Sequence, residues 1–468
     1  MASTSIVWLR NDLRIADNPA LSAAVAAADT TIALYIHETD TSLRAPGAAV
    51  RWWLHNSLSG LGAALAAHGI RLIVLQGKAI DLLPDLLREL GATSVFWNRR
   101  YAHGERDVDA AMKQCIRQEG ITATSFPGNV LIEPWDIATG QGKPYSVFTP
   151  FWKTLRWTDI ARPIGPPERR TPLEPEGFDT DYKAPAWSHK LAEHWSIGET
   201  AAQQALTAFL DERLSVYRDG RDFPARESTS RLSPYLRFGE ISARQVWHAA
   251  QSLSHAEPEL QEAVDKFLSE LAWRDFSYHQ LYHRADIAAV PMSPKYSAMS
   301  WRDAPEQLVA WQQGHTGLPI IDAGMRELWA TGTMHNRVRM LTASLLTKNL
   351  MIDWRVGERW FWDCLVDADM ASNPASWQWV AGCGLDAAPY FRIFNPVTQG
   401  ERFDADGDYV RRWVPELAGL PASWIHKPAD APRDVLASAG VEIGTNYPAP
   451  IVDLKSSRVR ALEAAAQL

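Results

Sequence analysis

The chain has 468 residues, a formal net charge of −8, and 46% hydrophobic against 22% charged residues. This length exceeds what one hydrophobic core usually covers, so we expect two domains, and the composition is that of an ordinary globular protein. The negative charge argues against nucleic-acid binding by bulk charge, although it leaves room for a local basic face. A charged residue interrupts the first apolar run and no stretch of about 18 apolar residues follows, so neither a signal peptide nor a membrane span is expected.

The three cysteines, Cys115, Cys364 and Cys383, lie far apart and form no CxxC pair. This spacing argues against a disulfide framework and against a zinc or iron–sulfur site with cysteine ligands, so no metal is expected. Unpaired cysteines are typical of a reducing compartment, and we expect a cytoplasmic protein.

The first third of the chain alternates short β-branched segments with helical ones. Strands are predicted over 5–10, 30–37, 71–77 and 93–100, and helices over 20–28, 50–69 and 82–91. Strand–helix alternation predicts a doubly wound parallel sheet. No GxGxxG follows the first strand, so a dinucleotide-binding Rossmann unit is not indicated.

The rest of the chain changes character twice. Proline, glycine and charge over residues 161–187 indicate a long connector, and most later segments have helical periodicity, including a helix expected within 455–468. We therefore expect an α/β domain over 1–130, a connector over 131–199 and a large all-α domain over 200–468.

Hydroxyl side chains gather at one expected helix start. Thr229, Ser230 and Ser233 lie beside Arg231 and just before Pro234. Hydroxyls and free backbone N–H groups at a helix N-terminus form a cradle for a phosphate or pyrophosphate. A plain serine or threonine N-cap explains the same residues more simply.

Two helical faces combine polar and apolar groups at positions i, i+3 and i+4. Glu270, Trp273 and Arg274 share one face, where the carboxylate either hydrogen-bonds a ligand or forms an intrahelical pair with Arg274. Asn336 and Met340 share another. An amide and a thioether suit the edge and the face of a nucleobase, although a lone methionine is more often core filler.

Two carboxylates and many indoles follow in the same half of the chain. Asp367 and Asp369 need buried donors, and Arg339 is the natural candidate. Nine of the 21 tryptophans lie between residues 271 and 379. They can be core aromatics, and closely spaced indoles can also pass an electron stepwise; the sequence leaves both uses open for Trp301, Trp354 and Trp377.

Taken together, these stretches resemble the DNA photolyase/cryptochrome family, most of all its bacterial cyclobutane pyrimidine dimer photolyases. The resemblance runs from about residue 5 to 455 and is carried by VWLRNDLRIADNPAL, TSRLSPYLRFGEIS, ELAWRDF, TGTMHNRVRM and SNPASWQWVAGCG. It implies FAD in a U-shaped conformation within the helical domain. The residues that it assigns to FAD are Tyr217, Thr229, Ser230, Leu232, Ser233, Phe267, Glu270, Arg274, Arg339, Asp367, Asp369 and Asn373.

Within this set the resemblance implies particular roles. Arg339 and Asp367 pair beside the isoalloxazine, Asp369 lies at its polar edge, and Asn373 faces flavin N5 and favours the reduced form. The resemblance also implies photoreduction of the flavin through Trp377, Trp354 and Trp301. A branched route stays open through Trp311, Trp329, Trp360 and Trp362.

The implied activity is light-driven repair of a pyrimidine dimer flipped out of DNA, in which excited reduced FAD lends the dimer an electron. The residues implied to line the dimer cavity are Glu270, Trp273, Asn336, Met340 and Trp379, with Glu270 stabilising charge on the dimer. Arg221, Arg337 and Arg392 are implied to grip DNA phosphates, and ultraviolet-damaged DNA is the expected partner of a monomer without an obligate protein partner.

The family often carries an antenna chromophore on its α/β domain. Glu105 keeps a carboxylate for a pterin, but Gly104 stands where an asparagine is expected, and the lysine expected before Trp301 has no clear equivalent. Methenyltetrahydrofolate is the first choice and a deazaflavin the alternative.

Two rival functions remain. A blue-light receptor of the cryptochrome type would use the same FAD, but Met340 stands where receptors tend to carry histidine, and no long tail follows residue 455. A dark flavin oxidoreductase is disfavoured because no nicotinamide fingerprint is present.

Overall fold

The computed structural model describes residues 3–178, 180, 182–390 and 392–468. The backbone divides into two compact units. The N-terminal unit comprises Met1–Ser215 and Ser230–Ala285, and the C-terminal unit comprises Val216–Thr229 and Asp286–Leu468. The sequence analysis divided the chain by fold class, into an α/β domain, a connector and an all-α domain, whereas these two units are divided by compactness. The predicted domain boundaries therefore stay a prediction.

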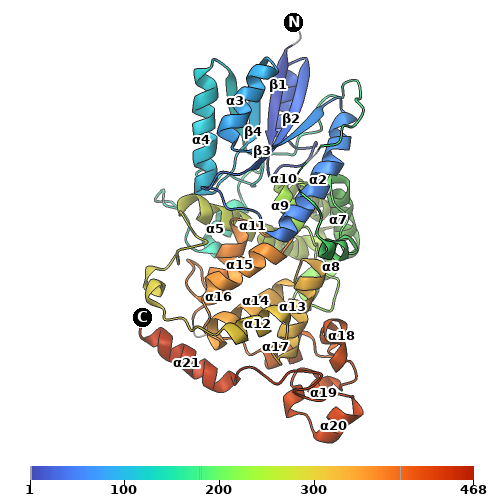
Figure 1. The fold of residues 1–468 in the computed structure, drawn as a ribbon, viewed down its shortest axis with the longest axis vertical. Helices are drawn as coiled ribbons and strands as arrows, with labels where there is room; N and C mark the ends of the chain where they lie inside the picture. The colour runs from blue at the N-terminus through green and yellow to red at the C-terminus, as the bar shows by residue number, and fades with distance from the viewer. Residues whose placement is uncertain (1–2, 179, 181, 391) are drawn as a thin grey trace. The chain divides into compact units, whose positions relative to one another are not determined.

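A five-stranded parallel sheet in the order β3-β2-β1-β4-β5 forms the centre of the N-terminal unit (Figure 1). Its strands are β1 (Thr4–Leu9), β2 (Thr30–Glu38), β3 (Arg71–Gly77), β4 (Ala92–Asn98) and β5 (Thr122–Phe126). In the central strand, Val7 pairs with Ala33 of β2 and with Phe96 of β4. The four predicted strands are confirmed to within two residues. The sequence missed β5, whose residues TATSF are short and mostly polar.

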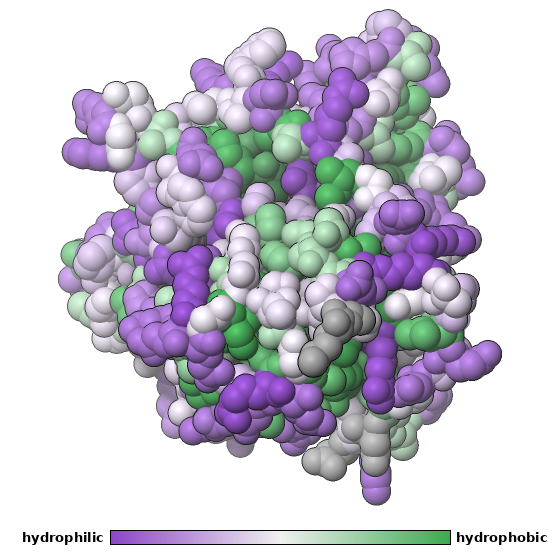
Figure 2. All heavy atoms as spheres, turned by 90° about the horizontal axis from the view of Figure 1, so that it is seen from above, coloured by the Kyte–Doolittle hydropathy of each residue, from purple (hydrophilic) through white to green (hydrophobic). Residues whose placement is uncertain are grey.

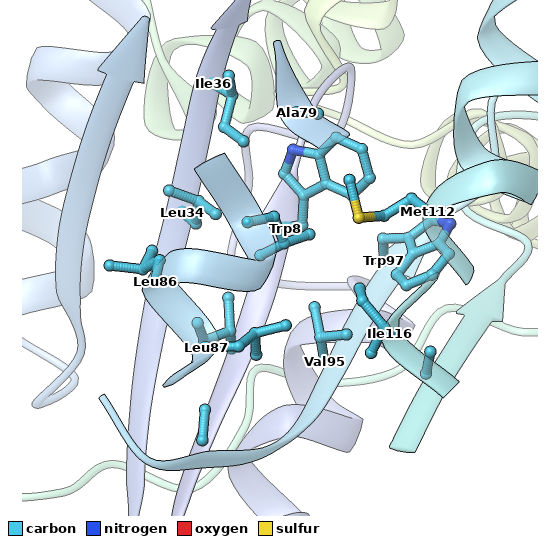
Figure 3. Packing of buried hydrophobic residues seen from close by; sticks show 14 of the residues in the cluster. Trp8, Leu34, Ile36, Ala79, Leu86, Leu87, Val95, Trp97, Met112 and Ile116 are labelled. Carbon is cyan, nitrogen blue, oxygen red and sulfur yellow. The ribbon is translucent and has the colours of Figure 1, made fainter. Parts of the chain in front are cut away.

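Helices cover both faces of this sheet, as predicted. They are α1 (Pro19–Ala27), α2 (Ala48–Ala66), α3 (Ala79–Glu89) and α4 (His103–Gln118). Alternate residues of the strands point to α3 and α4 and form a wholly apolar cluster (Figure 3). In it Trp8 meets Trp97 edge to face at 5.8 Å, and Met112 lies beside both indoles. Because the sheet is buried on both faces, most residues of these strands are apolar.

Short helices and irregular backbone follow the sheet. They are α5 (Phe148–Leu155), η1 (Ala186–Ser188), α6 (His189–Ala192), α7 (Glu199–Glu212), α8 (Leu214–Gly220), α9 (Ser233–Phe238), α10 (Ala243–Ala256), η2 (Pro258–Leu260) and α11 (Gln261–His283). The described residues of 159–185 form neither helix nor strand, in agreement with the predicted connector. Helix α11 is the longest of these elements and carries several predicted site residues.

The C-terminal unit is helical in the part of the chain that the structure describes, apart from one isolated bridge between Ile443 and Tyr447. Its elements are η3 (Pro294–Ala298), α12 (Pro305–Gln313), α13 (Pro319–Thr331), α14 (Asn336–Ser344), η4 (Leu345–Asn349), α15 (Trp354–Cys364), α16 (Ser372–Ala381), α17 (Pro396–Phe403), α18 (Asp408–Trp413), η5 (Pro415–Leu417), α19 (Ala422–Ile425), η6 (Pro428–Asp430), α20 (Arg433–Ser438) and α21 (Leu454–Ala466). The element η4 is a π-helical turn. The helix predicted within 455–468 is confirmed as α21.

The surface carries both hydrophilic and hydrophobic side chains. On the face drawn in Figure 2, hydrophilic side chains surround smaller hydrophobic areas. Large apolar side chains that are exposed include Trp135, Trp157 and Trp329. None of the helices that the structure describes has both the length and the apolar character needed to cross a membrane.

Candidate active site

Helix α16 contacts both α14 and α15 within the C-terminal unit, and the three helices carry eight of the predicted site residues (Figure 1). Helix α14 begins at Asn336 because His335 caps it, with Nδ1 accepting from the backbone N–H of Arg337 at 3.2 Å. Burial lowers the pKa of His335 to about 4, so the imidazole is neutral and free to accept. Asn336 is exposed and donates through Nδ2 to Sδ of half-buried Met340 at 3.9 Å. Their predicted common face is confirmed.

The ion pair predicted for Arg339 is confirmed with Asp367. Nη1 and Nη2 donate to the two carboxylate oxygens at 3.2 and 2.9 Å, a bidentate arrangement. Nε donates to the carbonyl of Met334 at 2.7 Å, and Nη2 also reaches Oγ1 of Thr333 at 3.2 Å. The guanidinium is therefore fixed in one plane next to a carboxylate that is 5% exposed.

Asp369 differs from this expectation. Its Oδ1 accepts from the backbone N–H groups of Ala371 and Ser372, at 2.9 and 2.7 Å, where α16 starts. The prediction that Arg339 also donates to Asp369 is wrong. The first N–H groups of a helix have no acceptor within the helix, so those at the start of α16 donate to Asp369 instead.

Asn373 lies in the first turn of α16 and is buried. Its Nδ2 donates to Oε1 of Glu358 at 2.8 Å and to the backbone carbonyl of the same residue at 3.1 Å. Glu358 is 1% exposed and comes from α15. Sequence analysis missed it, although a lone carboxylate inside the aromatic run WRVGERWFW was a signal that it needs a partner.

The predicted electron-transfer tryptophans lie in the same unit. Trp377 and Trp354 are buried, and Trp301 is half-buried. The ring of Trp377 lies 6.2 Å from that of Trp311 and 5.0 Å from that of Phe361. Trp311 is thus a neighbour of Trp377 that the chain Trp377–Trp354–Trp301 does not include. The linear route and the branched route through Trp311 both stay predictions.

Further indoles surround this group. Trp379 is half-buried on α16, two residues beyond Trp377. Trp329 is 57% exposed and stacks on Trp360, with ring centroids 6.4 Å apart and planes at 8°. Trp362 is buried.

The arginines predicted to grip DNA lie in different environments. Arg337 pairs with Asp222 at 2.7 Å and lies 4.3 Å over the ring of Phe403, with its side chain 17% exposed. Arg221 lies 5.5 Å over the ring of Tyr217, the buried residue assigned to FAD. A phosphate that reaches Arg337 has to share its guanidinium with a carboxylate.

Other guanidinium groups are exposed. Arg392 is exposed, and so are Arg226 and Arg402, which the sequence analysis did not single out. Arg226 lies 4.3 Å over Phe223, and Arg402 lies 5.0 Å over Phe403. A cation held on an aromatic face loses less freedom on binding a phosphate, so both are phosphate-contact candidates.

In the N-terminal unit, α11 carries the predicted Glu270. Its Oε1 accepts from Nζ of Lys266 at 2.7 Å, one turn earlier. Arg274 instead donates to the carbonyl and Oδ1 of Asn129, both at 2.7 Å. The alternative prediction of an intrahelical pair between Glu270 and Arg274 is therefore wrong, because Glu270 pairs with Lys266 and Arg274 with Asn129.

Aromatic stacking fixes Trp273. The ring of Phe148 from α5 lies 3.8 Å from it at an interplanar angle of 10°, and Phe276 meets it edge to face at 5.8 Å. Phe267, also assigned to FAD, is buried against Phe209 at 4.6 Å.

The hydroxyl cluster lies just before α9. The N-cap position is Leu232, without a side-chain capping bond, so the simple serine or threonine N-cap is wrong. Oγ of Ser230 accepts from the N–H of Leu232 at 3.4 Å, and Arg231 has a positive φ of 54°. Thr229 is half-buried and Ser233 is exposed. Their contact with FAD stays a prediction.

The expected antenna residue starts α4. Oε2 of Glu105 accepts from the N–H of Ala102 at 3.3 Å, and burial raises the pKa of its carboxyl, with Arg100 acting in the opposite direction. A Cβ at Gly104 would lie 2.6 Å from the carbonyl oxygen of Ser42. The asparagine expected at this position therefore does not fit this backbone.

A doubly wound sheet is followed by a helical unit that holds both the Arg339–Asp367 pair and the bond from Asn373 to Glu358, so the protein combines an α/β and an all-α part. Residues 5–168 match the family model of DNA photolyase, and residues 267–467 match that of the FAD binding domain of DNA photolyase. The chain belongs to the DNA photolyase/cryptochrome family.

Individual relatives agree with this. A deoxyribodipyrimidine photo-lyase of Agrobacterium fabrum is 48% identical over 98% of this chain and 97% of its own length. Cryptochrome-1 of Arabidopsis thaliana is 37% identical over 99% of this chain and 70% of its own length. The crystal structure of a class III photolyase from Agrobacterium tumefaciens, 48% identical, superposes with a TM-score of 0.93 over 100% of this chain and 98% of that one.

Proposed function

We propose that the protein is a deoxyribodipyrimidine photo-lyase, which uses light to split cyclobutane pyrimidine dimers in DNA by electron transfer from excited reduced FAD to the flipped-out dimer. One observation on α14 carries the proposal: the exposed amide of Asn336 and the thioether of Met340 share a face, and Arg339, the next residue to Met340, forms the bidentate pair with Asp367. Substrate recognition and cofactor binding then lie on one helix. The name of the Agrobacterium fabrum relative supports the same activity.

The residues of the C-terminal unit fit a flavin. Arg339 offers a guanidinium held in one plane, and Asn373 offers a buried amide whose nitrogen is already bound. When bound, FAD supplies light absorption and one-electron transfer. The Arg339–Asp367 pair would orient its ring and the amide of Asn373 would lie at N5, while the other residues assigned by resemblance would contact the rest of the cofactor.

The dimer is recognised by complementary groups. Asn336 hydrogen-bonds its polar edge, and Met340 and Trp379 contact its ring faces. Trp273, held by Phe148, provides a flat apolar wall, and Glu270, oriented by Lys266, stabilises negative charge that develops on the dimer. Arg221, Arg392, Arg226 and Arg402 contact phosphates, so affinity falls steeply as salt rises.

For the antenna, methenyltetrahydrofolate stays our proposal and a deazaflavin the alternative. The residues fit the folate only in part, because Glu105 is present but a side chain at position 104 is excluded by Ser42. The visible spectrum of the purified protein is the test, and a near-ultraviolet band beyond that of flavin reports a second chromophore. We also propose a cytoplasmic monomer; the compartment is supported by the three described cysteines, Cys115, Cys364 and Cys383, none of which forms a disulfide.

A blue-light receptor is the second candidate, and the 37% identity to Cryptochrome-1 over 99% of this chain favours keeping it. Repair and signalling separate in one assay. The reduced protein is mixed with ultraviolet-irradiated oligothymidine and thymine absorbance is followed under blue light and in the dark. Recovery only in the light supports repair; reduction of the flavin in the light without recovery supports the receptor.

A further inference from the structure

The amide of Asn373 can point only one way. Two acceptors of Glu358 face its nitrogen, namely Oε1 at 2.8 Å and the backbone carbonyl oxygen at 3.1 Å. A backbone carbonyl never donates a hydrogen bond, and an ionised carboxylate does not either. Turning the amide over would set Oδ1 against two oxygens and turn the buried Nδ2 away from both acceptors, at a cost of about 1–3 kcal/mol.

The same contacts decide what Asn373 offers on its other side. With both amide hydrogens directed at Glu358, the group that remains is the carbonyl oxygen Oδ1, which is an acceptor. Glu358 is 1% exposed and comes from the middle of α15, which contacts α16, so water does not compete for the nitrogen.

We propose that Glu358 is a positioning residue that fixes the orientation of Asn373, so that Asn373 presents an acceptor to N5 of the flavin. This inference rests on the proposed function, in which Asn373 faces N5. An acceptor stabilises a flavin that carries a proton on N5, as the reduced flavin does, and therefore raises the midpoint potential of the bound cofactor. Glu358 acts on the flavin through Asn373 and through its own negative charge, and the charge works in the opposite direction.

Two uncharged variants separate these effects. Glu358→Gln keeps a side-chain acceptor for the nitrogen of Asn373, whereas Glu358→Leu has similar bulk and leaves only the backbone carbonyl of residue 358 as an acceptor. Both remove the charge, so a difference between them reports the orientation of the amide. We expect the flavin of Glu358→Leu to have a more negative midpoint potential than that of Glu358→Gln, shifted toward that of Asn373→Leu. The measurement is a reductive titration of the FAD-loaded protein, with flavin content per chain as the control for folding.

Each outcome decides one point. Equal potentials in the two Glu358 variants, while Asn373→Leu shifts, overturn the positioning role and leave the proposed function intact. Unchanged potentials in all three variants, with FAD still bound, overturn the contact of Asn373 with N5 on which the inference rests.

Should Glu358→Leu not fold, neutron diffraction of the wild-type holoprotein gives the answer directly. Deuterons on Nδ2 directed at Glu358 support the positioning role. A nitrogen turned away from Glu358 overturns it.

Discussion

One layer of the N-terminal unit and the helices of the C-terminal unit bury different kinds of residue. The cluster between the sheet and helices α3 and α4 is wholly apolar. In the C-terminal unit, by contrast, several polar or charged side chains are 0–1% exposed: Thr342, Ser344, Thr347, Lys348, Asn349, Glu358 and Gln378. Burial of a polar group costs free energy unless a partner is supplied. Buried polar side chains are not confined to the helices, since Ser5 and Thr31 of the sheet are also 0–1% exposed. The difference therefore separates one apolar layer, which stabilises the fold, from elements in which each buried polar group needs a hydrogen-bond partner.

The largest effect is expected in the sheet. Trp8→Ala removes a fully buried indole that packs edge to face on Trp97 and should lower the free energy of unfolding by about 3–5 kcal/mol. Chemical denaturation measures the loss. The absorbance of bound flavin per folded molecule should stay unchanged. A loss of flavin from folded protein would mean that the apolar layer between the sheet and helices α3 and α4 also supports the flavin site.

The second effect concerns Lys348, whose Nζ donates to the carbonyl of Tyr390 at 3.0 Å and lies 3.7 Å over its ring. Burial lowers the pKa of Lys348 from 10.5 to about 7. Between these values the unfolded chain binds more protons, so the lysine makes stability rise with pH, by at most about 1.4 kcal/mol per pH unit. Below pH 7 both states carry the proton and this dependence ends.

Lys348→Met tests this. The difference in unfolding free energy between wild type and variant should change with pH across that window and be constant below it. A difference that does not change with pH would mean that the lysine stays charged when folded.

The third effect is a steric one at α15. A Cβ added at Gly357 would lie 2.2 Å from Cη2 of Trp377, so Gly357→Ala should displace the indole and cost about 1–3 kcal/mol. It should also slow photoreduction of the flavin if Trp377 is an electron carrier, measured by transient absorption. Gly60→Ala, on α2 with nothing within 4 Å of the added Cβ, is the matched control and should stabilise by about 0.5–1 kcal/mol.

The smallest effect is expected at Phe148, which lies stacked on Trp273. Phe148→Leu keeps an apolar side chain but loses the stacked pair, worth about 1 kcal/mol. Affinity for dimer-containing DNA should fall about fivefold, whereas affinity for undamaged DNA stays the same, as measured by fluorescence anisotropy. Phe148→Tyr should retain the stacking and the affinity. An equal loss on both DNAs would remove Trp273 from the dimer wall.

Local patterns were enough for the sheet and for single helical faces. The strands and helices of the first hundred residues followed from β-branched runs and helical periodicity, and the common face of Asn336 and Met340 followed from their spacing on one helix. The bidentate Arg339–Asp367 pair was also predictable, because a buried carboxylate needs a donor and few were available nearby.

Contacts between distant segments were not predictable in this way. Glu358 and Phe148 gained their partners, Asn373 and Trp273, only when separate helices came together. The exclusion of a side chain at Gly104 likewise depends on the backbone of Ser42, 62 residues away.

The sequence by itself determined the alternation of strands and helices, the family and the residues available for a flavin and a damaged base, since these depend on residue type and spacing along one element. Only the tertiary structure decided which acceptor each buried donor meets, as in the bonds from Asn373 to Glu358. The physical reason is that a hydrogen bond depends on angstrom-scale distance and direction between groups far apart in the chain, and hydrophobic periodicity carries no information about either.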